Sequence, residues 1–138
     1  MRNSGNQLVI VGNLTADPEV RFTPSGKAVM HFTVASTPRR FDQASEDWTD
    51  GETTFMDVTA WRQLAENAGD SLLKGSRVIV AGSVRTERWL DKESGDKRSR
   101  IVLDADDIGA SLMYATVEIR RTTTRSKSPE PEIGRAHV

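Results

Sequence analysis

The stretch Phe-Met-Asp-Val-Thr-Ala-Trp, residues 55–61, predicts the strand around which the rest of the chain is arranged. It is rich in strand-forming residues and contains neither Gly nor Pro. Successive side chains of a strand point to opposite faces, so Met56, Val58 and Ala60 share one face. That face is uniformly apolar and of modest size, which suits a hydrophobic core.

The odd-numbered face of this strand alternates aromatic and polar side chains. Phe55 and Trp61 lie at its ends, and Asp57 and Thr59 lie between them. An aromatic face with polar groups suits the stacking of unpaired bases, because every base has a flat apolar face. The alternative is that both rings cover a second core or a subunit contact. For this strand taken by itself the alternative is the simpler interpretation, since single exposed apolar residues are common.

Length and composition exclude several classes of protein. A chain of 138 residues favours one domain, and its formal net charge of -1 gives no global sign of a polyanionic partner. A nucleic-acid partner would therefore need a local basic face. The absence of Cys excludes disulfides, thiolate metal sites and Cys nucleophiles, and the two His residues form no cluster. We find no nucleophile–base pair and no phosphate-cradling loop, so we expect a protein without enzymatic activity and without a cofactor.

The N-terminus shows no basic start followed by an apolar run, so no signal peptide is predicted. No segment approaches the roughly 20 apolar residues of a membrane span. We therefore expect a cytoplasmic protein with no membrane partner.

Four further strands and one helix follow from the residue patterns. The strands are predicted at 7–11, 27–36, 77–89 and 98–103, and the helix at 62–74, before Gly75. A bend or bulge is expected after the first strand and another bulge at Gly82. Ser94-Gly95 predicts a hairpin turn. The polar stretch 37–53 is either a loop that closes over a ligand or the tip of a hairpin.

This order of elements predicts an all-β fold. A five-stranded Greek-key barrel with one helix between strands 3 and 4 is the OB-fold arrangement. Such barrels bind oligonucleotides on strands two and three and through the loops that join strands one to two and four to five.

Aromatic and basic residues coincide in the regions where an OB-fold binds its ligand. They are Arg21, Phe22 and Lys27 in the first loop, Arg39, Arg40, Phe41 and Trp48 between strands two and three, Phe55 and Trp61 on strand three, and Arg85, Arg88, Trp89, Lys92 and Lys97 on strands four to five. The acidic residues gather elsewhere, in residues 104–107 and in the tail. This coincidence favours base stacking over the buried-ring alternative.

Three blocks of the sequence resemble bacterial single-stranded DNA-binding proteins. They are residues 7–21, with Leu-Val-Ile-Val-Gly-Asn-Leu-Thr-Ala-Asp-Pro-Glu-Val-Arg, residues 72–78, Leu-Leu-Lys-Gly-Ser-Arg-Val, and residues 82–89, Gly-Ser-Val-Arg-Thr-Glu-Arg-Trp. The resemblance covers roughly residues 5–115. Residues 107–115, Asp-Ile-Gly-Ala-Ser-Leu-Met-Tyr-Ala, are similar to the actinobacterial branch. In that branch an added C-terminal strand hooks onto a neighbouring subunit, and residues 116–121 are the candidate hook.

The resemblance implies a nucleoid-associated homotetramer that binds and protects single-stranded DNA in replication, recombination and repair. Phe55, Trp61 and Trp89 match the stacking aromatics of the family. The fourth falls near Arg40 or Phe41, and Trp48 has no secure counterpart.

Basic residues fall into two groups under the resemblance. Lys74 and Arg88 match the basic contact positions of the family. Four others are candidates only by charge and neighbourhood: Arg2, Arg39, Arg62 and Arg85. Met56 replaces a His that forms a subunit contact in the best-known members, so that contact must differ here.

The predicted binding domain spans residues 1–121, and residues 122–138 have the composition of a disordered tail. Family members usually end in an acidic tip that contains an aromatic residue and recruits replication and repair proteins. This chain ends Ile-Gly-Arg-Ala-His-Val, so the question whether it recruits replication and repair proteins stays open. Either the chain is a second paralogue without the tip, or residues 133–138 are an artefact of a sequencing adapter read in frame.

The sequence is also compatible with two other functions. An OB-fold protein–protein adaptor of the replication-restart type would bury Phe55, Trp61 and Trp89 between chains. A carboxylate nuclease built on Asp104, Asp106 and Asp107 would require a metal, although unpaired acidic runs are usually solvated.

Overall fold

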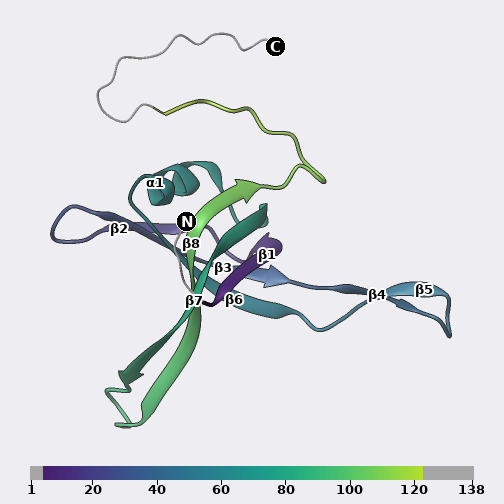
Figure 1. Ribbon diagram of the computed structural model, residues 1–138, viewed down its shortest axis with the longest axis horizontal. Helices are drawn as coiled ribbons and strands as arrows, with labels where there is room; N and C mark the ends of the chain where they lie inside the picture. The colour runs from purple at the N-terminus through teal and green to yellow at the C-terminus, as the bar shows by residue number, and fades with distance from the viewer. Residues whose placement is uncertain (1–4, 123–138) are drawn as a thin grey trace.

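The computed structural model describes residues 5–122, so Arg2 and the predicted tail from residue 123 onward lie outside the described residues. The elements are β1 (Gln7–Leu14), β2 (Glu19–Phe22), β3 (Ala28–Ser36), β4 (Arg39–Asp42), β5 (Asp47–Asp50), β6 (Thr54–Trp61), α1 (Arg62–Ser71), β7 (Arg77–Leu90) and β8 (Lys97–Ala110) (Figure 1). The mostly-β prediction with one helix after the central strand is confirmed for this part of the chain. The one described helix is too short to cross a membrane.

Five strands close into a hydrogen-bonded ring. Their order is β1, β7, β8, β6 and β3, and β3 pairs again with β1. Neighbouring strands are antiparallel except β6 and β8, which are parallel. β2 extends the sheet on the outer side of β3 and is not part of the ring.

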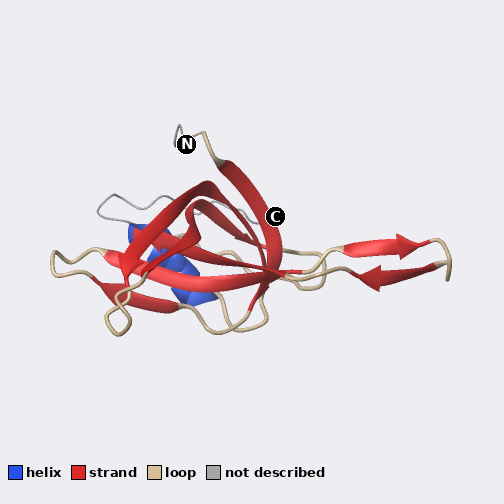
Figure 2. Ribbon diagram, turned by 90° about the horizontal axis from the view of Figure 1, so that it is seen from below, coloured by secondary structure: helices blue, strands red, loops and turns tan. Residues whose placement is uncertain are grey.

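The core fills the interior of this ring. The even-numbered face of β6 contributes to it as predicted, with Val58 and Ala60 fully buried and Met56 packed against them. Helix α1 lies against the strands (Figure 2) and adds Ala65 and Ala68. The largest side chains with no exposure in this core are Met30, Val34, Val58, Val78, Val80 and Leu103.

The ring closes where β1 meets β3, and Gly12 makes this contact possible. A Cβ atom at Gly12 would lie 2.3 Å from the carbonyl oxygen of Ala35, closer than real atoms approach. The first strand was predicted to end at Val11, which is wrong. β1 keeps its register with β7 through Asn13 and then pairs with β3 at Asn13 and Leu14, so it serves two neighbours.

A second close approach lies between β7 and β8. The register shifts between Ala81 and Gly82, which confirms the predicted bulge. A Cβ atom at Gly82 would lie 2.0 Å from the carbonyl oxygen of Asp104. The last strand was predicted to end at residue 103, which is also wrong. β8 continues to Ala110 because its backbone stays paired with β7, so Asp104 and the acidic residues after it belong to a strand and not to a solvated loop.

Residues 37–53 form a hairpin, which decides between the two predicted alternatives. β4 and β5 make a separate two-stranded sheet that projects from the ring (Figure 1). The rings of Phe41 and Trp48 pack edge to face across it, with their centroids 5.5 Å apart.

Helix α1 ends three residues before the predicted position. Leu72 is already extended, with φ -105° and ψ 150°, and Gly75 has a φ of 89°. The amide of Lys74 donates a hydrogen bond of 2.8 Å to the carboxylate of Asp17. This tertiary contact competes with a further helical turn.

Residues 111–122 form no strand within the single chain. The side chain of Arg77 fixes their start, because its Nε donates to Ser111 Oγ at 3.2 Å and its guanidinium lies 5.6 Å from the centre of the Tyr114 ring. Ile119 is 88% exposed. The hook function of residues 116–121 needs a neighbouring subunit and stays a prediction.

Substitution of Gly82 by Ala should destabilise the protein by about 1–3 kcal/mol, because the added methyl group would force the paired backbones apart. Gly109→Ala is the matched control, since a Cβ atom at Gly109 on the partner strand meets nothing within 4 Å. Thermal unfolding followed by circular dichroism measures both. Equal melting temperatures for the two variants would contradict this account of the bulge.

Candidate nucleic-acid interface

The outer face of β6 carries two exposed rings on a polar sheet surface. Phe55 is 65% exposed and Trp61 41% exposed. Arg21 and Trp61 lie in one row across β2, β3 and β6, because both are in register with Val29. The ammonium group of Lys27 lies 5.9 Å from the centre of the Trp61 ring. One end of this face therefore combines an aromatic platform with two cations.

The middle of the same face is polar, and its side chains are linked by hydrogen bonds. Asp57 accepts a hydrogen bond of 2.8 Å from Thr33 Oγ1. Thr59 is buried, and its hydroxyl lies 3.3 Å from Nδ1 of His31. His31 is exposed on β3. A groove lined by residues of β2, β3 and β6 runs along this polar middle and reaches Arg100.

Trp89 is joined to β6 through Arg100. The indole is 46% exposed and lies on the β7–β8 hairpin, with the guanidinium of Arg100 6.0 Å from the ring centre. Nη1 of Arg100 donates to Asp57 at 3.2 Å, and Nε of Arg100 donates to Glu87 at 3.0 Å. The three predicted stacking residues therefore share one surface, with Arg100 between Trp89 and the strand that carries Phe55 and Trp61.

Ion pairs continue along β7 and β8. Arg85 contacts Glu87 at 3.1 Å and donates a further hydrogen bond to Asp104. We call the five residues of this network the ion-pair cluster: Asp57, Arg85, Glu87, Arg100 and Asp104. The cluster crosses above Val102, which is in register with both Asp57 and Arg85 and is fully buried.

Hydrogen bonds within the cluster favour the charged forms of Glu87 and Arg85. The hydrogen bond from Arg100, and then the one from Arg85, lowers the pKa of Glu87 below its ordinary value. The hydrogen bond to Asp104 raises the pKa of Arg85. Two guanidinium groups face three carboxylates, so the centre of the surface carries one net negative charge.

The remaining predicted basic residues do not gather on this surface. Arg88 follows Glu87 on β7, so its side chain leaves the opposite face of the strand. Lys74 lies after α1, and Arg62 is the first residue of α1. Arg62 has a φ of 60°, a left-handed conformation that costs a non-Gly residue about 1 kcal/mol or more. It lies where the chain turns sharply after Trp61.

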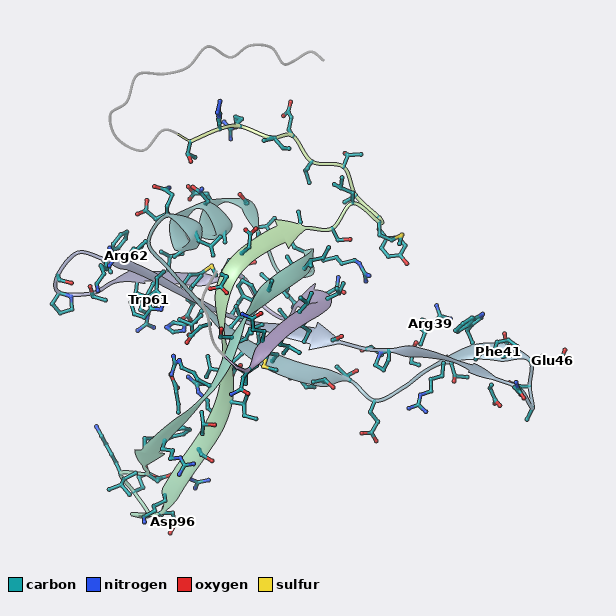
Figure 3. All side chains as sticks on the ribbon, viewed as in Figure 1. Arg39, Phe41, Glu46, Trp61, Arg62 and Asp96 are labelled. Atoms are coloured by element: carbon teal, nitrogen blue, oxygen red, sulfur yellow. The ribbon has the colours of Figure 1, made fainter. Side chains whose placement is uncertain are left out.

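The predicted loop residues lie on the β4–β5 hairpin, away from β6. Figure 3 shows Arg39 and Phe41 on this hairpin, far from Trp61 at the other end of the molecule. Arg39 lies 3.7 Å from Asp50 in an exposed ion pair. Arg40, Phe41 and Trp48 are exposed as well, but four carboxylates share the hairpin with them: Asp42, Glu46, Asp47 and Asp50. The hairpin is therefore a mixed surface and not a basic one.

Sequence analysis missed the carboxylates of the interface. Asp57 was noted only as a polar residue, and Glu87 and Arg100 were absent from the predicted site. The predicted hairpin turn contained the signal that would have identified the pair of Glu87 and Arg100. Once Asp91 and Asp96 close the turn, the strand register places Glu87 directly opposite Arg100.

The acidic run on β8 does not form a metal site in the described residues. Asp104 is bound to Arg85, and Asp106 and Asp107 leave opposite faces of the strand. Within residues 5–122 no group of three His, Asp or Glu side chains is placed to hold a metal ion. The nuclease alternative finds no support in this geometry.

Comparisons with known proteins agree on one family. The model of the single-strand binding protein family matches residues 5–111. A single-stranded DNA-binding protein of Paenarthrobacter aurescens is 53% identical over 115 residues, which are 83% of this chain and 67% of that protein. A protein of the same name from Mycolicibacterium smegmatis is 51% identical over 116 residues, 84% of this chain and 70% of its own.

A solved structure adds a comparison of folds. The crystal structure of a small single-stranded DNA-binding protein from Streptomyces coelicolor superposes with a TM-score of 0.66 and 37% sequence identity. The match covers 77% of this chain and 94% of that one.

The stabilising effect of Glu87 should depend on pH. Because its pKa is lowered in the folded protein, its contribution is complete above the ordinary value of 4.5 and is lost as the pH falls through the lower folded value. We expect Glu87→Gln to lower the melting temperature by a few degrees at pH 7 and by progressively less as the pH falls below 4.5. Glu93→Gln is the control, since Glu93 makes no ion pair with a described residue. A difference that persists unchanged at acid pH would contradict the ion-pair explanation.

Proposed function

The chain belongs to the single-strand binding protein family, and from that premise we propose that it binds single-stranded DNA through the outer face of β6 and the β7–β8 hairpin. Binding is independent of base sequence and serves replication, recombination and repair. We assign the ring of five strands to the OB-fold barrel.

The observation that carries this proposal is the arrangement of Phe55, Trp61 and Trp89. All three rings are exposed on one surface, and Trp61 and Trp89 each have a cationic side chain within 6.0 Å of the ring centre. Stacking of a base on such a ring contributes about 1–3 kcal/mol and hardly depends on the identity of the base. Duplex DNA hides the faces of its bases, so the surface selects single strands.

Phosphate contacts come from basic residues at the margins of the surface. Arg21 lies in the same row of the sheet as Trp61, and the ammonium group of Lys27 lies 5.9 Å from the centre of the Trp61 ring. Neutralised phosphates release their counterions, so affinity falls as the salt concentration rises. No bond of the DNA is broken, because stacking and ion pairing alone account for the function.

We propose further that four chains assemble, with residues 116–121 as a hook on a neighbouring subunit. Exposed apolar side chains on β1, on β7 and after β8 support this assignment, because a chain that stayed single would leave them in water. They are Val9, Ile79, Leu112, Met113, Tyr114 and Ile119.

Removal of a stacking ring should weaken DNA binding. We expect Phe55→Ala, Trp61→Ala and Trp89→Ala each to raise the Kd for fluorescein-labelled oligo-dT by about 5- to 150-fold in fluorescence anisotropy. Leu90→Ala is a matched control, since Leu90 is 63% exposed next to Trp89 but leaves the other face of β7.

Wild-type binding that weakens with salt and quenches tryptophan fluorescence completes the expected result. If wild-type protein at low salt neither binds oligo-dT nor shows quenching, the function is wrong, and the rings serve the protein–protein interface of an adaptor.

Size-exclusion chromatography with light scattering tests the assembly. Wild-type protein should have four times the 15.3 kDa mass of one chain. Ile119→Asp should shift the mass toward smaller species, because it places a charge in the proposed subunit contact. Glu118→Lys, at the neighbouring exposed residue, changes a charge without placing one on an apolar side chain and should leave the mass unchanged. A single-chain mass for the wild type would contradict the proposed tetramer.

A further inference from the structure

We propose that Glu87 is a built-in competitor of the DNA phosphates, which holds Arg85 and Arg100 in ion pairs on the binding surface and thereby limits the affinity for single strands. This inference rests on the proposed function. It gives a role to Glu87 and Arg100, which the predicted contact positions do not include.

The geometry places Glu87 between the two guanidinium groups. Its Oε1 accepts from Nε of Arg100 at 3.0 Å, and its Oε2 lies 3.1 Å from Nη1 of Arg85. The far sides of both arginines are also occupied by carboxylates, since Arg100 donates to Asp57 and Arg85 donates to Asp104. Each guanidinium is therefore shared by two carboxylates, with Glu87 common to both.

These contacts occupy donors that a phosphate would otherwise use. Arginine binds phosphate and carboxylate with the same fork of N–H groups, so the two anions compete for the same positions. Nε and Nη1 of Arg100 both donate to carboxylates. A phosphate that approaches Trp89 thus meets a guanidinium already neutralised and, beside it, the charge of Glu87.

The position of the cluster makes the competition relevant to binding. Arg100 lies 6.0 Å from the centre of the Trp89 ring, and Glu87, Arg88, Trp89 and Arg100 line one hollow. Asp57 at the other end of the cluster lies on the strand that carries Phe55 and Trp61. DNA that reaches from Trp89 to β6 must cross the cluster, where three carboxylates outnumber two guanidinium groups.

The cluster is weak enough to be exchanged. The side chains of Arg85 and Arg100 are 42% and 47% exposed, and that of Glu87 is 32% exposed. Ion pairs with such access to water contribute little net stability. Phosphates can therefore displace the carboxylates, but each exchange releases fewer counterions than contact with a free arginine would.

The test compares Glu87→Gln with wild type in titrations of fluorescein-labelled oligo-dT over a series of NaCl concentrations. The amide keeps the shape of the side chain and removes its charge. We expect Kd to fall by about 3- to 20-fold at the lowest salt concentration, because each of the two guanidinium groups loses one of its two carboxylate partners and can bind a phosphate in its place. The slope of log K against log salt should steepen by about 0.7–1.4, because each phosphate contact on a single strand contributes about 0.7.

Two further variants separate the ion pairs from a general change of charge. Glu93→Gln makes the same change at the tip of the same hairpin, where the side chain of Glu93 forms no ion pair with a described residue, and should alter Kd by less than about twofold. Addition of Arg85→Gln and Arg100→Gln to Glu87→Gln should abolish the gain. Melting curves establish that each variant is folded.

Each outcome decides a separate question. If wild type does not bind oligo-dT, the proposed function and this inference both fail. If wild type binds but folded Glu87→Gln binds equally or more weakly, the proposed function stands and Glu87 is not a competitor. If Glu93→Gln gives as large a gain, the effect is general and the ion pairs do not cause it.

Discussion

Closure of the five-stranded ring is the constraint on which the other features depend. The ring closes only where backbones approach more closely than side chains normally allow, at Gly12 against Ala35 and at Gly82 against Asp104. The bulge at Gly82 bends β7 and β8. One half of each strand therefore belongs to the ring, and the other half extends from it as a hairpin. The extension carries Trp89, and closure thereby places it on the same surface as Phe55 and Trp61.

The proposed binding surface is organised by charge as well as by rings. Aromatic platforms lie at its ends, and a network of carboxylates and guanidinium groups lies between them. A net charge of -1 for the whole chain concealed this arrangement, because acidic residues are not segregated from the proposed DNA face. A surface of this kind derives its affinity more from stacking than from charge, which fits a protein that must hold single strands and also release them.

The fold could be predicted from local patterns, and the details of the interface could not. Alternation in residues 55–61 correctly separated the core face from the outer face, and Gly82 correctly marked a bulge. The ends of β1, β8 and α1 were missed because tertiary pairing set them: β1 gained a second neighbour, β8 stayed paired with β7, and Asp17 captured the amide of Lys74. The pair of Glu87 and Arg100 depended on the hairpin register, and single-residue signals of charge do not contain that information.

The β4–β5 hairpin shares no backbone pairing with the ring, and this separation makes it a modular part of the molecule. Two strands alone are marginally stable in water, so its order depends on local contacts such as the packing of Phe41 on Trp48. The carboxylate of Asp42 accepts hydrogen bonds from Ala44 and Ser45 at its tip. A reporter group or a grafted peptide could therefore be inserted at this tip. The length and sequence of the hairpin can be changed without altering the packing of the core.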